Sequence, residues 1–291
     1  MPNYTYPDVD PLIAAVKNKF SVTDHDTLEA LETDFVVARD RELLHGHGPT
    51  GTFDAAHLNS IHRHLFQDVY EWAGRTRDEK VRLADGTIAT EPVIRKADGK
   101  PFMLGARIPG ALKAISDRLR KANHLRGLSR GEFATQAADI MAAINAIHAF
   151  REGNGRTQRA FIRPLAKPAG HTLDFTVISQ ERMIQASIAA NEREDPSIMR
   201  RLFADATNPA RIAALRRVIA FFVRQEYRWN DHYVATLDPG HAVELTMAGS
   251  ASDQFMARTG AEILIGQTSD LPSPLPARGE VFVYEGHTPW A

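Results

Sequence analysis

One short stretch of the chain holds most of the side chains that chemistry on phosphate groups would need. Residues 148–159 read His-Ala-Phe-Arg-Glu-Gly-Asn-Gly-Arg-Thr-Gln-Arg, so a histidine, a carboxylate, a glycine turn and two arginines lie close together. A histidine ordinarily has a pKa near neutrality and can accept a proton from a hydroxyl group. Arginine binds phosphate through paired N–H groups, and a carboxylate is a preferred ligand of Mg²⁺. The combination indicates a phosphate-binding site with a base beside it.

The turn formed by Gly153, Asn154 and Gly155 is the expected centre of that site. Successive backbone N–H groups in such a turn can form a concave anion-binding nest. If a helix begins there, its free N–H groups and its dipole add to the same site. Arg156 can then bind one phosphate, and Arg159, one helical turn further on, can bind another.

Three more residues of the stretch have expected roles. His148 would take the proton from an incoming hydroxyl group as its oxygen attacks phosphorus. Glu152 would bind a Mg²⁺ ion that bridges the protein and the substrate phosphates, and Phe150 would anchor the loop in the core. Each feature alone has an ordinary structural explanation, since a histidine at a helix end usually caps or packs. Their occurrence together favours the functional interpretation.

The elements that must position this stretch are mostly helical. Ser129 and Glu132 match the capping box that begins helices, and an apolar stripe at helical spacing follows them. This helix would deliver His148 at its C-terminal end. A second helix is expected over 156–167, bent at Pro164. Further helices are predicted over 27–44, 54–70, 179–190 and 208–228, and from about residues 109 and 195.

The stretch from residue 75 to residue 109 interrupts the helical pattern. Residues 81–83 and 87–90 have the composition of strands, and Asp85-Gly86 between them is a tight-turn signal, with a second one at Asp98-Gly99. We expect a long exposed hairpin, or flap. It carries the basic residues Lys80, Arg82, Arg95, Lys96, Lys100 and Arg107. These side chains form either a solvated hairpin face or a docking surface for an acidic face of a target protein.

Composition changes after residue 231. Lysine is absent from 231–291, and short strand-like runs at 242–247, 262–265 and 281–284 are separated by glycine and proline. We therefore divide the chain into residues 1–230 and a small β domain at 231–291, which is expected to be a partly open barrel of the OB type. The acidic character of this domain argues against nucleic-acid binding, which needs lysine and arginine.

The overall composition argues against several classes of protein. The net charge is -1, so nothing in the electrostatics favours a nucleic-acid partner, and the absence of cysteine excludes disulfides and thiolate metal sites. No apolar run is long enough for a membrane span, and the N-terminus lacks the features of a signal peptide. The pairs His45/His47 and His62/His64 lack the further ligands that a zinc site needs. No P-loop motif is present.

The stretch at 148–159 resembles the Fic family motif, His-x-Phe-x-[Asp/Glu]-Gly-Asn-Gly-Arg-x-x-Arg, at every specified position. Ala149 lies where the family usually has proline, which would make the loop less rigid without removing a catalytic atom. Residues 69–77 resemble the family's Tyr-x-Trp-Ala-Gly segment before its flap, and the resemblance covers about residues 25–205. It implies a mainly α fold, a Fic-type helical bundle with a β-hairpin flap. With the small OB-like β domain that follows, the layout is similar to that of Bartonella effector proteins.

The resemblance also implies a reaction, in which AMP passes from ATP to a hydroxyl group of a target protein and pyrophosphate is released. By position in the motif, His148 would be the base and Glu152 the Mg²⁺ ligand. The triphosphate cradle would consist of Gly153, Asn154, Gly155, Arg156 and Arg159. The flap at about 80–107 would hold the target segment as an added β-strand.

Regulation and location are part of what the resemblance implies. Many Fic proteins carry an inhibitory [Ser/Thr]-x-x-x-Glu-[Gly/Asn] helix, but here only Thr87 has a glutamate at that spacing, and this residue, Glu91, lies in the flap. Inhibition would therefore come from a separate small antitoxin whose glutamate reaches Arg159, or there is no such control. A secreted effector or toxin would reside in the bacterial cytoplasm before export and in the host cytoplasm afterwards. A host small GTPase is one candidate target.

Two alternatives stay open at this point. The same scaffold can transfer UMP, phosphocholine or phosphate, although the presence of both arginines favours a triphosphate donor and AMP. The chain can also be a non-enzymatic interaction module. His148 and Glu152 argue against the second alternative, because a binding module need not keep a base and a metal ligand.

Overall fold

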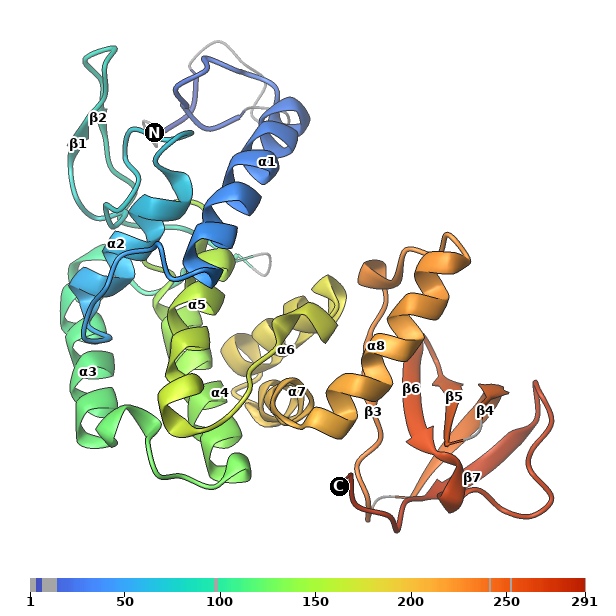
Figure 1. Cartoon of the computed structure of the whole chain (residues 1–291). Coiled ribbons are helices and arrows are strands. Elements are labelled where there is room, and N and C mark those ends of the chain that lie inside the picture. Colours follow the sequence, from blue (N-terminus) through green and yellow to red (C-terminus); the bar gives the residue numbers. More distant parts are fainter. Residues whose placement is uncertain (1–3, 7–14, 97–98, 241, 252, 291) are drawn as a thin grey trace. The chain divides into compact units, whose positions relative to one another are not determined.

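The computed structural model describes residues 4–6, 15–96, 99–240, 242–251 and 253–290. The chain forms two compact units (Figure 1), of which the first comprises residues 1–126 and 143–165 and the second residues 127–142 and 166–291. The helix α4 (Arg130–Ile147) contributes residues to both units. The fold is mostly helical with a small C-terminal sheet, so the predicted fold class is confirmed. The boundary between residues 230 and 231 stays a prediction.

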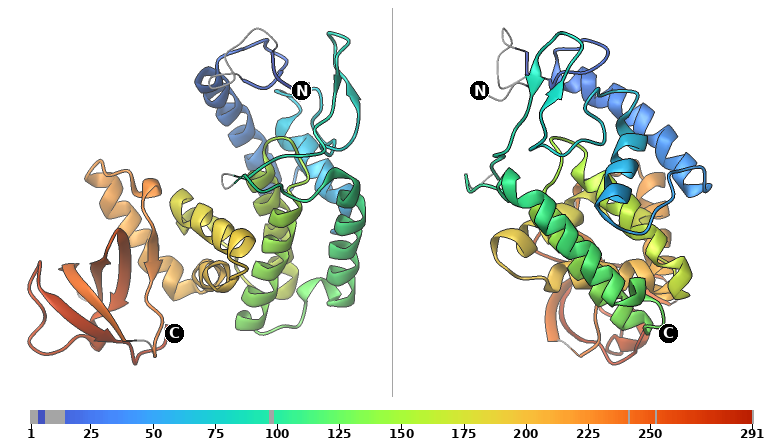
Figure 2. Two further views of the ribbon diagram at one scale, coloured as in Figure 1. Left: turned by 180° about the vertical axis from the view of Figure 1, so that it is seen from behind. Right: turned by 90° about the vertical axis from the view of Figure 1, so that its left-hand side faces the viewer.

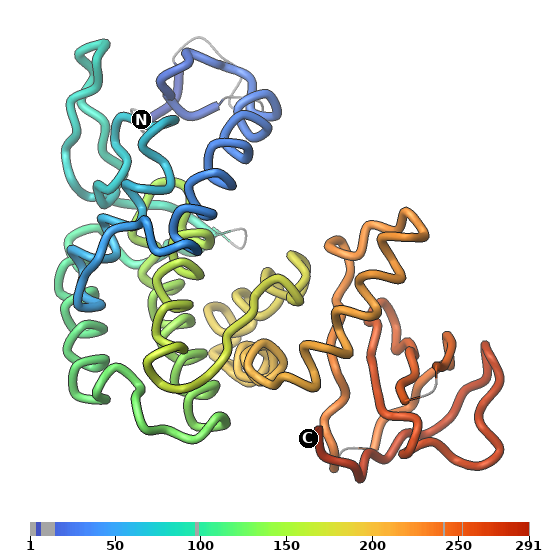
Figure 3. The backbone as a smooth tube through the Cα atoms, in the orientation of Figure 1, coloured from blue at the N-terminus to red at the C-terminus, as the bar shows by residue number. Residues whose placement is uncertain are grey.

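The helices of the first unit pack around α2. They are α1 (His25–Leu44), α2 (Ala55–Phe66), α3 (Ile108–Lys121) and α5 (Asn154–Ile162), with 3-10 turns at Gly105–Arg107, Asn123–Leu125 and Arg163–Leu165. α2 contacts α1, α3 and α5, and Figure 3 shows α5 running beside it. The Asp54 carboxylate caps α2 by accepting a hydrogen bond from the backbone N–H of His57 at 2.9 Å. The helix ends at Phe66 rather than at Tyr70 as predicted, because the backbone N–H of Val69 bonds to the Phe66 carbonyl only three residues back and the chain turns.

α5 begins and ends earlier than the sequence pattern indicates. It starts at Asn154, because Gly153 adopts a left-handed φ of 76° and turns the chain directly into the helix. The α-helix ends at Ile162, and Pro164, which has no N–H group to continue it, lies in the 3-10 turn that follows. The start of α5 within the motif places its first turn at the predicted anion site.

The flap contains the predicted hairpin (Figure 2), although its strands are short. β1 (Val81–Arg82) pairs with β2 (Ile88–Ala89) in antiparallel fashion. Gly86 has a φ of 82° in the turn between them, a conformation that glycine adopts readily. Lys17 fixes the turn, since its Nζ lies 2.7 Å from the Asp85 carboxylate.

The helical part of the second unit follows the predicted signals closely. Its helices besides the start of α4 are α6 (Gln180–Glu192), α7 (Ser197–Thr207) and α8 (Pro209–Arg224), with 3-10 turns at Lys167–Ala169, Phe175–Val177 and Trp229–Asp231. The capping box before α4 is confirmed, because the Glu132 carboxylate accepts the backbone N–H of Ser129 at 2.9 Å. α8 ends at Arg224, four residues before the predicted end. Within the described ranges, none of the helices has the length and apolar character to cross a membrane.

A five-stranded sheet completes the second unit. Its strands are β3 (Val234–Thr236), β4 (Ala242–Ser250), β5 (Gln254–Thr259), β6 (Glu262–Gln267) and β7 (Val281–Glu285), in the order β3-β6-β5-β4-β7. β3 runs parallel to β6, and the other pairs are antiparallel. The core of the sheet contains Leu245, Met247, Phe255 and Tyr284. The three predicted strands are confirmed, β3 and β5 were not predicted, and the OB type stays a prediction.

Candidate active site

The motif loop leaves α4 through a strained residue. His148 follows the last residue of the helix and has a left-handed φ of 49°, which is uncommon for any residue other than glycine. Arg77 holds this turn in place: its Nε donates to the His148 carbonyl at 2.7 Å, and its backbone N–H donates to the Ala149 carbonyl at 2.8 Å. The Arg77 side chain is completely buried. The position of the candidate base is therefore fixed by an arginine from outside the motif.

Asn154 closes the loop on itself. Its side-chain oxygen accepts the backbone N–H of Phe150 at 3.0 Å, and its amide nitrogen donates to the Phe150 carbonyl at 2.8 Å. Both side-chain groups are used in this way, so only the backbone of Asn154 remains for a ligand. Phe150 itself is buried and its ring stacks on that of His62, with centroids 3.9 Å apart.

The ring of Phe66, in α2, lies against Gly153 and Arg156 of the predicted phosphate site. A Cβ atom on Gly153 would lie 2.2 Å from the Phe66 ring, so only glycine fits there. The Arg156 guanidinium lies over the same ring at 4.9 Å from its centroid. No side chain caps α5 at Gly153, which leaves the first N–H groups of the helix for a ligand. Gly155 is exposed, with no atom closer than 3.5 Å to a Cβ built there.

The two motif arginines differ in their partners. Arg156 forms an ion pair with Glu32 of α1 at 2.5 Å and lies 3.8 Å from Glu152. Glu152 is 45% exposed, and its carboxylate accepts the backbone N–H of Gly153 at 3.0 Å. The Arg159 side chain makes no hydrogen bond or ion pair with any described residue. Burial, and to a smaller extent the positive charge of Arg156, lowers the pKa of the Arg159 guanidinium.

His148 is half-buried, and its imidazole is neutral at neutral pH. The ring of Phe102, from the flap, stacks on its imidazole with centroids 3.9 Å apart, and Nδ1 has no hydrogen-bond partner among the described residues. Burial, together with the positive charges of Arg77 and Arg151, lowers the pKa of His148 to about 4. At neutral pH the imidazole is therefore in the form that accepts a proton.

His62 is a residue of the site that sequence reasoning treated only as a weak metal ligand. Its Nδ1 accepts the backbone N–H of Gly74 at 2.8 Å, so its Nε2–H donates to the Glu152 carbonyl at 3.1 Å. Burial lowers its pKa to about 3 and keeps it neutral. Both ring nitrogens are used, and the residue positions the backbone of the motif loop. The signal for this role was the Tyr-x-Trp-Ala-Gly segment, whose glycine is its partner.

The flap is attached to the motif through Arg77 and Glu91. The Arg77 guanidinium donates to the carbonyls of Pro92, at 2.8 Å, and of Met103. Glu91 forms an ion pair with Arg151 and not with Arg159, which agrees with excluding it as an inhibitory glutamate. Burial raises the pKa of the Glu91 carboxyl.

The basic residues of the flap are mostly exposed. Lys80, Arg82, Arg95, Lys100 and Arg107 are exposed, and Lys96 is half-buried. The Lys96 Nζ lies 5.7 Å from the Phe102 ring centroid, and its carbonyl accepts the backbone N–H of Gly99 at 3.0 Å. Asp98 of the second predicted turn lies outside the described residues. A docking role for these side chains stays a prediction.

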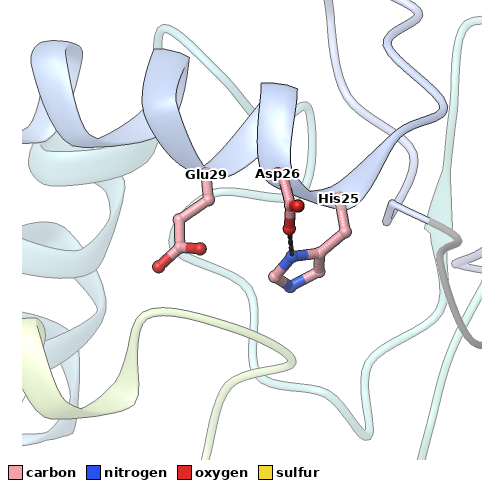
Figure 4. Close-up of side chains that lie close together, drawn as sticks. All are labelled: His25, Asp26 and Glu29. Atoms are coloured by element: carbon pink, nitrogen blue, oxygen red, sulfur yellow. Dashed lines mark ion pairs between the residues drawn. The ribbon is translucent and has the colours of Figure 1, made fainter.

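One further group of side chains among the described residues has the geometry to hold a metal ion. His25, Asp26 and Glu29 lie together at the start of α1 (Figure 4), and all three are exposed. Acidic residues in the first turn of a helix interact favourably with its dipole, which accounts for them without a ligand. We assign no function to this group.

The helical fold, the flap and the motif loop held by Arg77 together define a protein with a candidate polyphosphate-binding site beside a neutral histidine. The chain belongs to the Fic/DOC family, which it matches over residues 52–165. The protein adenylyltransferase of Bartonella henselae is 34% identical to it over 280 residues, which are 93% of this chain and 49% of that protein. The chain spans about half or less of the length of the first curated relatives it matches.

Solved structures of relatives agree with this assignment. The type IV secretion system effector protein BepA is 31% identical, with a TM-score of 0.89 over 98% of this chain and 96% of that one. BepC, a VirB-translocated effector of Bartonella tribocorum with bound AMPPNP, is 39% identical, with a TM-score of 0.67 over 71% of this chain and 97% of that one. The predicted resemblance to the Fic family and to Bartonella effectors is therefore confirmed.

Proposed function

We propose that the chain is a protein adenylyltransferase that transfers AMP from ATP to a hydroxyl side chain of a target protein and releases pyrophosphate. The observation that carries this proposal is the neutral imidazole of His148 beside the uncapped first turn of α5. The names of the relatives support the same activity, and relatives with bound AMPPNP and ADP support an adenine nucleotide as the donor.

In the proposed reaction, the target hydroxyl oxygen attacks the α-phosphorus of ATP and its proton passes to the His148 imidazole. The bond between the α-phosphorus and the bridging oxygen breaks, and pyrophosphate leaves with that electron pair. The N–H groups of Gly155 and its neighbours in the first turn of α5, with Arg156 and Arg159, bind the phosphate oxygens. Arg77 keeps His148 at the edge of this site.

Mg²⁺ fits the same site. The Glu152 carboxylate is 45% exposed at the start of α5, and a single carboxylate combined with phosphate oxygens is a donor set that Mg²⁺ prefers. Glu152 would hold the ion, which would supply charge neutralisation to the polyphosphate.

The proposal extends to partners. The flap residues Lys80, Arg82, Arg95, Lys96 and Lys100 would contact an acidic face of the target, with a host small GTPase as one candidate. Arg159, whose side chain makes no hydrogen bond or ion pair with the described residues, would receive a glutamate from a separate antitoxin. Relatives described as VirB-translocated effectors support export from the bacterial cytoplasm to a host cell.

The decisive experiment compares two labels in ATP. Bacterial and host lysates are incubated with Mg²⁺ and the wild type, His148→Ala or His45→Ala, in which an exposed histidine is removed. We expect a protein band labelled from the α-phosphate and not from the γ-phosphate, present with the wild type and His45→Ala and absent with His148→Ala. Label from the γ-phosphate would indicate phosphate transfer instead. If ATP, UTP and CDP-choline all fail as donors, the chain is a binding module.

A further inference from the structure

Arg156 and Arg159 differ in their contacts with the rest of the protein, although their positions in the motif predict similar roles. The Arg156 Nη1 lies 2.5 Å from the Glu32 carboxylate, and its guanidinium lies over the Phe66 ring. Arg159 has no such support among the described residues. One arginine of the candidate cradle is therefore held before any ligand arrives.

Glu32 is itself firmly held. Its side chain is 5% exposed, and the hydroxyl of Tyr70 donates a hydrogen bond to its carboxylate. Burial and the neighbouring Glu32 raise the pKa of Tyr70, so the hydroxyl keeps its proton and stays a donor. The Tyr70 ring stacks on Trp72 with centroids 4.3 Å apart, which fixes its orientation. Tyr70 of the Tyr-x-Trp-Ala-Gly segment is thus connected to Arg156 of the phosphate site through the Glu32 carboxylate on α1.

The Glu32 contact leaves part of the guanidinium available. Arginine carries five N–H donors, and Glu32 engages one terminal nitrogen. The other, Nη2, faces Glu152 at 3.8 Å. Arg156 is 30% exposed while Glu32 is almost completely buried, so the carboxylate lies behind the arginine. This is the geometry of a support and not of a ligand that fills the site.

We propose that Glu32, held by Tyr70, is a positioning residue that orients Arg156 for the polyphosphate chain of the nucleotide. This inference rests on the proposed function, because it assigns Arg156 to a phosphate. Holding the side chain in its binding orientation reduces the ordering cost that accompanies ligand binding. Removing the Glu32 charge should therefore weaken phosphate binding and leave recognition of the nucleoside unchanged.

The test measures affinities of purified protein for adenosine, AMP, ADP and ATP by calorimetry with Mg²⁺. Glu32→Gln keeps the size of the side chain and removes its charge. We expect its affinity for ATP to fall by up to about ten-fold, the cost of ordering one long side chain on binding, and its affinity for adenosine to stay unchanged. A loss that first appears with AMP, ADP or ATP indicates that Arg156 binds the α-, β- or γ-phosphate, respectively. A purely structural defect would weaken all four ligands together.

Three further variants make the result specific. Glu42→Gln introduces the same change on α1 at a residue that pairs with Arg39, and it should bind ATP like the wild type. Tyr70→Phe, which removes a single hydroxyl, should show a smaller loss of the same sign and serves if Glu32→Gln does not fold. In Arg156→Gln, adding Glu32→Gln should cause no further loss, because the two residues act through one interaction.

Several results would overturn the inference. ATP affinity that is unchanged or tighter in Glu32→Gln would show that Glu32 does not support Arg156, and a tighter value would make it a competitor of the phosphates. An equal loss for adenosine, or wild-type protein that binds adenosine as tightly as ATP, would also contradict it. Binding requires no transfer, so wild-type protein that binds ATP without labelling any target would defeat the proposed function and leave the role of Glu32 intact.

Discussion

Each compact unit contains a buried arginine–carboxylate cluster. The two clusters differ in whether an arginine side chain stays accessible to a ligand. In the second unit, Asp205 lies between Arg182 at 2.6 Å and Arg211 at 2.9 Å, with relative side-chain exposures of 1%, 1% and 10%. Thr236 donates to Asp205 through its hydroxyl at 2.6 Å and its backbone N–H at 3.1 Å. In the first unit, Glu32 is also buried, at 5% exposure, but its partner Arg156 is 30% exposed.

The difference separates a cluster that stabilises the fold from one that can bind a ligand. Both carboxylate oxygens of Asp205 accept hydrogen bonds, and the cluster joins α6, α7, α8 and β3. Burial opposes ionisation of Asp205, but the charges of Arg182 and Arg211 hold its pKa below the usual range. In the first unit the buried carboxylate supports an arginine that still reaches solvent. Burial of ions alone therefore does not mark a site.

The largest expected effect is on the closed cluster. Asp205→Asn should lower the free energy of unfolding by about 3–5 kcal/mol, because Arg182 would remain buried without a compensating charge and Arg211 would keep only its ion pair with Asp238. Urea unfolding measures this loss. Asp253→Asn breaks an exposed pair with Arg217 and should cost only about 0–1 kcal/mol. Equal losses in the two variants would mean that the buried cluster is no more important than a surface pair.

The open site is expected to be less critical for stability but sensitive to shape. Gly153→Ala should lower the free energy of unfolding by about 1–3 kcal/mol, because φ is 76° and the new Cβ would meet Phe66 at 2.2 Å. Gly155→Ala is the matched control, since its Cβ would meet nothing closer than 3.5 Å. Thermal unfolding of the two variants is the measurement. A loss of stability in Gly155→Ala as large as in Gly153→Ala would contradict the role of Phe66.

The motif and its local elements could be predicted from sequence because their signals are local. The capping box of α4, the hairpin at Asp85-Gly86 and the glycine turn that begins α5 all depend on residues within a few positions of one another. The helix boundaries near Phe66 and Ile162 were less accurate, because a turn and a proline end those helices before the apolar pattern does.

The residues that brace the site could not be predicted, because they come from elsewhere in the chain. Glu32, His62 and Arg77 contact the motif across long sequence separations, and although Arg77 and the partner of His62, Gly74, belong to the recognised 69–77 segment, that segment does not show what they contact. β3 was missed for a related reason. It has only three residues, and it is a strand because β6 lies beside it in parallel.

Asp205 is buried and stays charged, whereas burial keeps His148 neutral. The smallest expected effect follows from this difference. Asp205 is buried with partners and stays charged, whereas the Nδ1 of His148 is buried without one. A base with its ordinary pKa of about 6.5 would lose roughly ten-fold in its neutral fraction between pH 7.5 and pH 5.5. With the pKa of His148 lowered to about 4, it stays neutral throughout that range and protonates only near pH 4. The kcat/KM for transfer with saturating Mg²⁺ should therefore change little. Proton NMR of the imidazole, assigned by comparison with His148→Ala, measures the titration directly, and a midpoint near 6.5 would show that burial does not set the charge of this residue.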